Sequence, residues 1–141
     1  MLPETIHLEI VTSDRKIVGL DVDEVIMPGK EGYLGVLPGH APLLSELDIG
    51  QLMYRRGDMR HYLSMAWGFA EVLPDKVSVL AEIAERAEDI DRERANRARD
   101  RAKQRLQGQS GDIDLRRAQV ALQKALIRIQ VASHAGPDRP E

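Results

Sequence analysis

The distribution of proline and glycine constrains the fold of this chain more than any other feature. Five of the seven prolines and eight of the eleven glycines lie before Asp75, and no proline occurs between Asp75 and Gly136. Proline fixes φ and removes a backbone donor, whereas glycine permits positive φ, so both residues favour tight turns and disfavour helix interiors. The chain is therefore predicted to have an N-terminal part of strands and tight turns and a helical C-terminal part.

The charge of the chain divides at nearly the same place. Residues 1–83 carry 13 acidic and 7 basic side chains, a net charge of -6, whereas residues 84–141 carry 10 acidic and 13 basic side chains, a net charge of +3. Only 4% of the residues are aromatic, so the basic half lacks the side chains on which bases stack, and nucleic-acid binding is not expected. No apolar run approaches the roughly 20 residues of a spanning helix, and no signal peptide is expected.

Short extended segments fill the front of the chain. Ile6, Leu8 and Ile10 alternate with His7 and Glu9, which is the period-2 pattern of a half-buried strand. The other extended segments are predicted at residues 17–26, 50–55, 60–67, 68–73 and 77–81. Many short strands without helix-length patterns between them predict an antiparallel sandwich or barrel of about 80 residues.

From residue 85 onwards the apolar spacing becomes helical. Asp89 is predicted to cap a first helix, and its thin apolar face consists of Ala87, Ala95, Ala98, Ala102 and Leu106. The turn at residues 107–111 ends this helix, and Asp112 is predicted to cap a second helix that runs to about Ser133. The apolar stripe of the second helix consists of Leu115, Ala118, Leu122, Ala125, Leu126 and Ile129. The two helices should form an antiparallel hairpin, followed by a disordered tail at 135–141.

Residues 28–44 form the segment richest in turn residues. They contain Pro28, Gly29, Gly32, Gly35, Pro38, Gly39 and Pro42. Such a segment is either an ordinary connector between strands or a shaped surface that approaches a partner closely, and composition alone leaves both interpretations open.

No catalytic motif is present in the chain. It lacks a phosphate-binding loop, a nucleophile elbow and a zinc-binding helix signature. The absence of cysteine excludes disulfides and thiolate chemistry. The four histidines, His7, His40, His61 and His134, show no metal-ligand spacing. An enzyme is therefore not expected, and no metal site is predicted.

One constellation of charged residues stands out near the predicted boundary between the two parts. Asp91 and Arg94 lie three residues apart on one helix face, where the guanidinium can bind phosphate oxygens and the carboxylate can accept from ribose or adenine groups. The alternative is an ordinary capped helix with an intrahelical ion pair. A basic stripe on the second helix, made of Arg117, Lys124 and Arg128, is also explained by solubility alone.

Four segments of the chain resemble the epsilon subunit of F-type ATP synthase, in the same order and spacing. They are G-Y-L-G-V-L-P-G-H-A-P-L-L at 32–44, S-M-A-W-G-F-A-E-V at 64–72, R-A-E-D-I-D-R-E-R-A at 86–95 and G-D-I-D-L-R-R-A at 111–118. The resemblance implies an α+β fold, in which a ten-stranded antiparallel β-sandwich at 1–84 precedes a regulatory antiparallel two-helix hairpin at 85–134.

The resemblance also implies a regulatory ATP site and no required cofactor. Residues Ile90, Asp91, Arg94 and Ala95 are similar to the ATP-binding motif of the family. The other positions of the family site match Glu85, Arg101, Lys124 and Arg128 here. Lys124 departs from the arginine of strong ATP binders, and lysine lacks the bidentate geometry of a guanidinium.

The function that the resemblance implies is that of a non-catalytic subunit of the central stalk, or rotor. Glu31 would face the ring of c subunits, while His40 and Pro42 would face the gamma subunit. Tyr33 departs from the acidic residue that the family often has between Gly32 and Leu34, on the surface towards the ring. The hairpin would inhibit ATP hydrolysis when it extends towards the catalytic beta and alpha subunits. The complex would couple proton translocation to ATP synthesis at the cytoplasmic face of the bacterial inner membrane, with membrane contact only through partners. The rival interpretation is a free-standing nucleotide-sensing module without a rotary partner.

Overall fold

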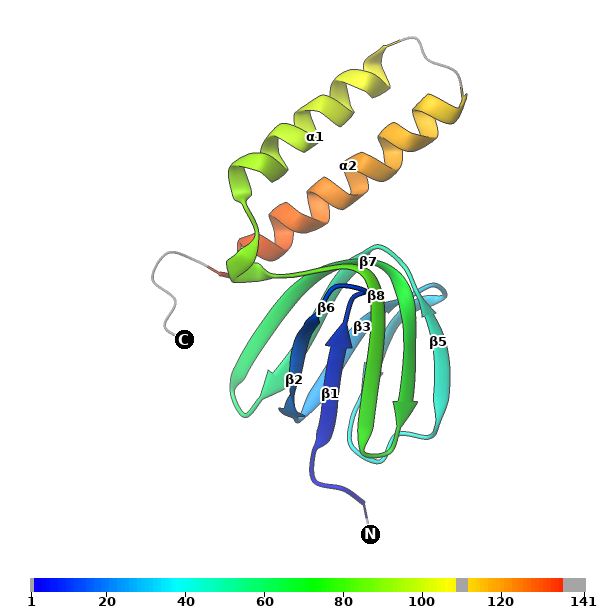
Figure 1. Cartoon of the computed structure of the whole chain (residues 1–141), viewed down its shortest axis with the longest axis vertical. Helices are drawn as coiled ribbons and strands as arrows, with labels where there is room; N and C mark the ends of the chain where they lie inside the picture. Colours follow the sequence, from blue (N-terminus) through cyan, green and yellow to red (C-terminus); the bar gives the residue numbers. More distant parts are fainter. Residues whose placement is uncertain (1, 109–111, 136–141) are drawn as a thin grey trace.

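A computed structural model describes residues 2–108 and 112–135 of the chain (Figure 1). The strands in this part are β1 (Ile6–Val11), β2 (Lys16–Val22), β3 (Glu24–Gly29), β4 (Gly32–Val36), β5 (Leu43–Leu47), β6 (Gly50–Arg56), β7 (Met59–Leu73) and β8 (Lys76–Arg86). A short 3-10 turn, η1 (Ala87–Asp89), leads to the helices α1 (Arg92–Gln107) and α2 (Asp112–Ala132). The strands form a sandwich, and the two helices lie across one end of it (Figure 1). The predicted α+β class is confirmed.

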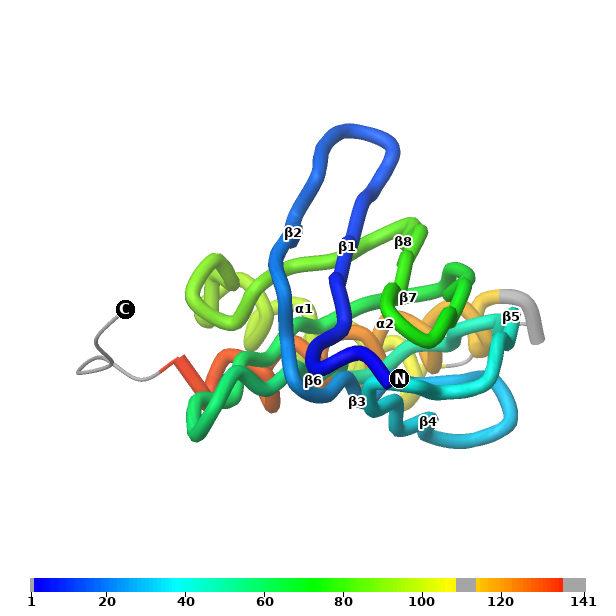
Figure 2. The backbone as a smooth tube through the Cα atoms, turned by 90° about the horizontal axis from the view of Figure 1, so that it is seen from below, coloured from blue at the N-terminus to red at the C-terminus, as the bar shows by residue number. Residues whose placement is uncertain are grey.

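The strands pair in the order β2-β1-β8-β7-β5-β3-β4, and β6 pairs with both β3 and β7. All the described ladders are antiparallel except the one between β1 and β8, which is parallel. The β1–β2 hairpin projects from the rest of the sandwich and places β2 at an edge (Figure 2). The Arg86 guanidinium donates a hydrogen bond to the Ile17 carbonyl, which joins the end of β8 to that edge.

The prediction of ten strands is wrong: the described part of the chain has eight. The extended segments predicted at 60–67 and 68–73 form a single strand, β7, which keeps one register with β8 from Leu63 to Leu73. The first half of β7 pairs with β6 and its second half with β5. Because neighbouring strands hold both halves, the glycine at position 68 does not end the strand, and β7 and β8 contribute to both layers of the sandwich.

The core of the sandwich consists of alternating residues from these strands. Ile6, Leu8 and Ile10 are buried, as the period-2 pattern predicts. They pack with aliphatic side chains from the other strands, among them Val25, Met27, Val36, Leu47, Leu52, Leu63, Val72, Val77 and Val79. Burial of this apolar surface is the main stabilising contribution to the sandwich.

The helices form the predicted antiparallel hairpin through a thin seam of small residues. Ala95 and Ala102 on α1 and Ala118 and Ala125 on α2 are buried. Small side chains permit close approach of the two helices but bury little apolar area. The prediction that Leu126 belongs to this stripe is wrong, since its side chain is 46% exposed. A helix turns about 100° per residue, so when Ala125 faces α1 its neighbour points away.

The start of α1 also differs from the prediction. Asp91, rather than Asp89, is the N-cap, because its carboxylate accepts a hydrogen bond from the backbone N–H of Arg94 at 3.0 Å. Asp89 ends the 3-10 turn, and Ile90 has extended backbone angles that separate this turn from α1. Strand β8 continues to Arg86, two residues beyond position 84. Residues 136–141 of the predicted tail and 109–111 of the predicted turn lie outside the described residues. Over residues 2–108 and 112–135, neither helix has the length and apolar character needed to cross a bilayer.

Candidate functional site

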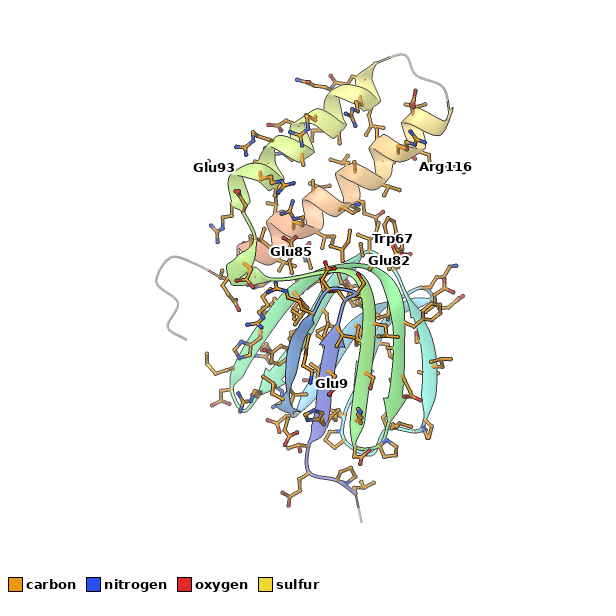
Figure 3. The ribbon with its side chains drawn as sticks, in the orientation of Figure 1. Glu9, Trp67, Glu82, Glu85, Glu93 and Arg116 are labelled. Carbon is orange, nitrogen blue, oxygen red and sulfur yellow. The ribbon has the colours of Figure 1, made fainter. Side chains whose placement is uncertain are left out.

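A pocket of about 270 Å³ lies where the hairpin meets the sandwich. Its apolar wall consists of Ile49, Met65, Ala66, Ile83 and Ile127, and its polar wall consists of Ser64, Glu85, Arg94, Lys124 and Arg128. The two walls come from β7, β8, α1, α2 and the residue before β6, so the pocket exists only while the helices are folded onto the strands. Figure 3 shows Glu85 and Trp67 on the side of the sandwich that faces α2.

Glu85 on β8 and Arg128 on α2 form a paired contact across this pocket. The Arg128 Nε donates to Glu85 Oε1 at 2.7 Å, and Nη2 donates to Oε2 at 3.3 Å. The two side chains are only 21% and 31% exposed, for Arg128 and Glu85 respectively. A bidentate, charge-assisted pair that is partly shielded from water is stronger than an exposed ion pair. It joins residues that are 43 positions apart in the sequence.

Lys124 makes another contact between α2 and the strands. Its ammonium nitrogen lies 5.2 Å from the centroid of the Trp67 ring, within the range of a cation–π interaction. Arg94 reaches the same pocket from the start of α1. Three cationic side chains from the two helices therefore surround a space that contains one carboxylate, which is an arrangement suited to an anionic ligand.

The structure brings together Glu85, Arg94, Lys124 and Arg128 of the predicted ATP site. The other four predicted residues are not among those that line the pocket. Ile90 and Ala95 are buried, Asp91 serves as the N-cap of α1, and Arg101 is exposed further along α1. Sequence reasoning missed Trp67 and the apolar wall, because nothing in the local pattern indicates which strand residues face the hairpin.

The predicted partner-binding residues lie at opposite ends of β5. Glu31 is exposed in the turn between β3 and β4, beside a surface groove of about 640 Å³ that Tyr33, Leu43 and Leu44 also line. The neighbouring Lys30 pairs with Glu46 at 2.8 Å, and this hydrogen-bonded carboxylate raises the pKa of the Lys30 ammonium. The groove therefore has a charged rim and an apolar wall.

His40 and Pro42 lie in the loop before β5, close to the turn between β7 and β8. The backbone N–H of Gly39 donates to the Pro74 carbonyl at 2.8 Å, and φ of Gly39 is +88°. Pro42 is exposed. Beyond this loop, the outer face of the sheet carries three exposed apolar side chains, Leu44, Phe69 and Leu80; Phe69 lies directly opposite Leu80 on the next strand. Exposed apolar residues gathered on one face are typical of a protein-binding surface.

A metal centre has no basis in the described residues, 2–108 and 112–135, since no three histidine, aspartate or glutamate side chains among them come together as ligands. Three of the charged groups of the pocket contact other protein groups: Glu85 pairs with Arg128, and Lys124 lies over Trp67. The described geometry is therefore that of a binding and docking site.

Comparison with known proteins agrees with this arrangement. The family described as "ATP synthase, Delta/Epsilon chain, beta-sandwich domain" matches residues 5–87, and the family described as "ATP synthase, Delta/Epsilon chain, long alpha-helix domain" matches residues 88–133. The chain is 51% identical over 134 residues to an ATP synthase epsilon chain of Nitratidesulfovibrio vulgaris, which covers 95% of this chain and 100% of that protein. It is 47% identical to an ATP synthase epsilon chain of Syntrophobacter fumaroxidans, over 93% of this chain and 98% of that protein.

Solved structures show the same fold. A chain of the Euglena gracilis mitochondrial ATP synthase, in a structure of its OSCP, F1 and c-ring parts, superposes with a TM-score of 0.81 and 25% identity over 95% of this chain and 84% of that one. A central stalk and c-ring structure of the Tetrahymena thermophila mitochondrial ATP synthase contains a chain with a TM-score of 0.55 and 16% identity, which concerns the fold alone. The two family matches together span the sandwich and the hairpin, and the chain therefore belongs to the ATP synthase delta/epsilon chain family, as an epsilon-type, non-catalytic stalk subunit.

Proposed function

We propose that this subunit binds the gamma subunit and the c-ring through its sandwich and couples proton translocation to ATP synthesis. The observation that carries the proposal is the 51% identity to an ATP synthase epsilon chain over that protein's whole length. The exposed apolar row of Leu44, Phe69 and Leu80, next to the loop of His40 and Pro42, suits the gamma subunit. The groove beside Glu31 suits a loop of the c-ring. Through these partners the subunit sits at the cytoplasmic face of the bacterial inner membrane.

Co-purification from membranes tests the proposed assembly. An affinity-tagged chain is expected to retain the gamma, alpha and beta subunits, whereas Leu44→Glu, which places a charge in the apolar row, should lose them. Met59→Glu serves as the control, because Met59 is another exposed apolar residue, at the start of β7 and away from that row. Recovery of the tagged chain without any of these subunits would favour the rival interpretation, a free-standing nucleotide-sensing module.

We further propose that the hairpin inhibits ATP hydrolysis when it leaves the sandwich and extends towards the alpha and beta subunits. The apolar cluster between the hairpin and the strands is small, which supports this proposal, because release of the hairpin exposes little buried apolar area. A chain truncated after Asp89 keeps the whole of β8, including the Arg86 contact with Ile17. Reconstituted into the complex, it should support ATP synthesis and lose the inhibition of hydrolysis; inhibition that persists at the full level would contradict the role of the hairpin.

ATP is the regulatory ligand that we propose for the pocket. The convergence of Arg94, Lys124 and Arg128 on one space supports an anionic ligand, and the apolar wall suits a base. Calorimetry on the isolated chain should detect ATP binding, weaker in Arg94→Ala and tighter in Lys124→Arg, since arginine supplies a bidentate fork. If neither the wild type nor Lys124→Arg binds ATP at millimolar concentration, the sensing role is wrong and the stalk role stands unaffected.

A further inference from the structure

We propose that the hairpin is held on the sandwich by a ligand-independent latch, which we call the α2 latch. It consists of two pairs, Lys124 with Trp67 and Arg128 with Glu85. The latch requires neither ATP nor a partner subunit, and so it goes beyond the proposed functions. It makes the docked hairpin the resting state of the free chain, with a salt-sensitive release.

The first support for the latch is the position of its two cations. Lys124 and Arg128 are four residues apart on α2, so their side chains lie on one face of the helix, one turn from each other. Each of them meets a different strand: Trp67 belongs to β7 and Glu85 to β8. Two contacts one turn apart fix both the position of α2 and its rotation about its own axis.

The second support is the backbone of Trp67. Its φ is +59°, the only positive value among the described residues other than glycine, and such a value is a strained outlier for a bulky side chain. In the ladder between β7 and β8, the pairing runs on both sides of Trp67 and skips Trp67 itself. Strain of this kind persists only where surrounding contacts maintain it, and it is concentrated at functional positions. Here the indole lies against Lys124, on the side of the sandwich that faces α2 (Figure 3).

The third support is the contrast with the other end of the interface. There, Ala87, Ile90, Val131 and Ala132 form a small apolar cluster, with Tyr62 packed against it. The Tyr62 ring also stacks on His134, with ring centroids 3.6 Å apart. This end is apolar and aromatic and responds little to salt, whereas the latch is ionic. Loss of the latch should therefore free the body of the hairpin while the apolar cluster acts as the pivot.

The chain itself supplies the probe for this proposal. Trp67 is the only tryptophan and there is no cysteine. Quenching of tryptophan fluorescence by acrylamide in the full-length chain therefore reports directly on how far α2 shields the Trp67 indole from solvent. Spin labels on Gln119→Cys in α2 and Glu71→Cys in β7, both exposed positions, report the distance between hairpin and sandwich without background labelling.

The variants separate the latch from general effects of charge. Arg128→Gln and Glu85→Gln should each raise the quenching constant about twofold and broaden the label distance towards longer values, because each leaves half of a bidentate pair. Arg116→Gln removes the same charge from the exposed far end of α2 and should change neither measurement (Figure 3). The charge-reversed double variant, Glu85→Arg with Arg128→Glu, should restore most of the docking. Lys124→Met should loosen the hairpin, whereas Lys124→Arg should retain it.

Salt provides an independent arm of the test. Roughly 1 M sodium chloride shortens the screening length to about 3 Å, so it should lengthen the label distance in the wild type and in Arg116→Gln and add little in Arg128→Gln. The proposal is overturned if Arg128→Gln and Glu85→Gln keep the wild-type distance distribution. It is equally overturned if the charge-reversed pair behaves no better than the single variants, since the contact would then be incidental to docking.

Discussion

Gly68 is a residue at which the backbone of the long strand β7 lies close to that of β8, and Gly68→Ala is a sharp test of the described packing. An added Cβ at this position would lie 2.1 Å from the Leu80 carbonyl oxygen and 3.0 Å from the Ala81 Cα. Both neighbours are backbone atoms of a paired strand, so no side chain can rotate to make room. Alanine would therefore force the two strands apart.

The size of the effect follows from these distances. A carbon and a carbonyl oxygen rarely approach closer than about 3.3 Å even in close β-sheet contacts, so the strands would have to separate by roughly 1 Å. The pairs Gly68 with Ala81 and Phe69 with Leu80 lie at this place in the ladder. Weakening two hydrogen bonds costs about 2 kcal/mol, and overpacking adds about 1 kcal/mol or more. The free energy of unfolding of the sandwich should fall by about 3 kcal/mol.

Urea unfolding followed by the amide signals of Leu8 and Val79 measures this change in the sandwich alone. With an m-value of about 2 kcal/mol per molar, the midpoint should fall by roughly 1.5 M. Gly35→Ala is the matched control, because no atom lies within 4 Å of its added Cβ, and it should stay within about 0.5 kcal/mol of the wild type. Equal midpoints for the two variants would show that β7 and β8 do not approach each other as described.

Three further predictions concern the hairpin and the surface of the sandwich. Asp91→Ala removes the N-cap of α1 and should lower the free energy of unfolding of the hairpin by about 1 kcal/mol, whereas Asp91→Asn should retain most of it, as measured by circular dichroism melts. Ala102→Leu should destabilise the hairpin by about 1–3 kcal/mol, because Ala102 is 1% exposed in the seam with α2; an unchanged melt would contradict the close approach. The Lys16 hydrogen bond and charge lower the pKa of the Glu9 carboxyl, so the stabilising effect of this pair is present above the ordinary range of glutamate and is lost as the pH falls through the lowered pKa. Carbon-13 titration should show that Lys16→Met raises this pKa towards the ordinary glutamate value.

The sequence predicts those parts of the fold in which local pattern and tertiary environment agree. The alternation at Ile6, Leu8 and Ile10 and the alanine spacing at Ala95 and Ala102 both describe faces that are buried in the structure. The division of residues 60–73 into two strands is wrong because glycine is a local signal of a break, while the continuity of β7 depends on hydrogen bonds to β5, β6 and β8. Most residues of these partner strands are distant in the sequence, and the pattern of apolar and polar residues within 59–73 does not indicate which strands pair with β7.

The candidate site was predicted only in part, for a related reason. Glu85, Arg94, Lys124 and Arg128 converge because the hairpin folds back on the strands, and only the resemblance to a family connected these positions beforehand. Two roles compete for the Asp91 carboxylate: the nucleotide contact that the resemblance implies, and the N-cap of α1. Its carboxylate is three residues before an amide that it can cap, and capping satisfies a backbone donor that would otherwise lack a partner at the start of α1. The local requirement determines its position in the described structure.

Arg128 connects the α2 latch to the proposed nucleotide site, because Glu85 occupies only the Nε and Nη2 edge of its guanidinium. A guanidinium has five N–H donors, so a phosphate that binds through Nη1 leaves the pair with Glu85 in place. A phosphate that takes the Nε and Nη2 edge displaces the carboxylate, and part of its binding free energy then replaces a contact instead of adding one. A ligand shifts a conformational equilibrium only by its differential affinity for the two states. A saturating ligand at 100 times its Kd would contribute about 2.7 kcal/mol, and this gain already includes any loss of the resident pair. Since the latch docks the hairpin in the absence of nucleotide, the ATP-free chain is expected to remain largely docked, and ATP is expected to reinforce that state and not to create it.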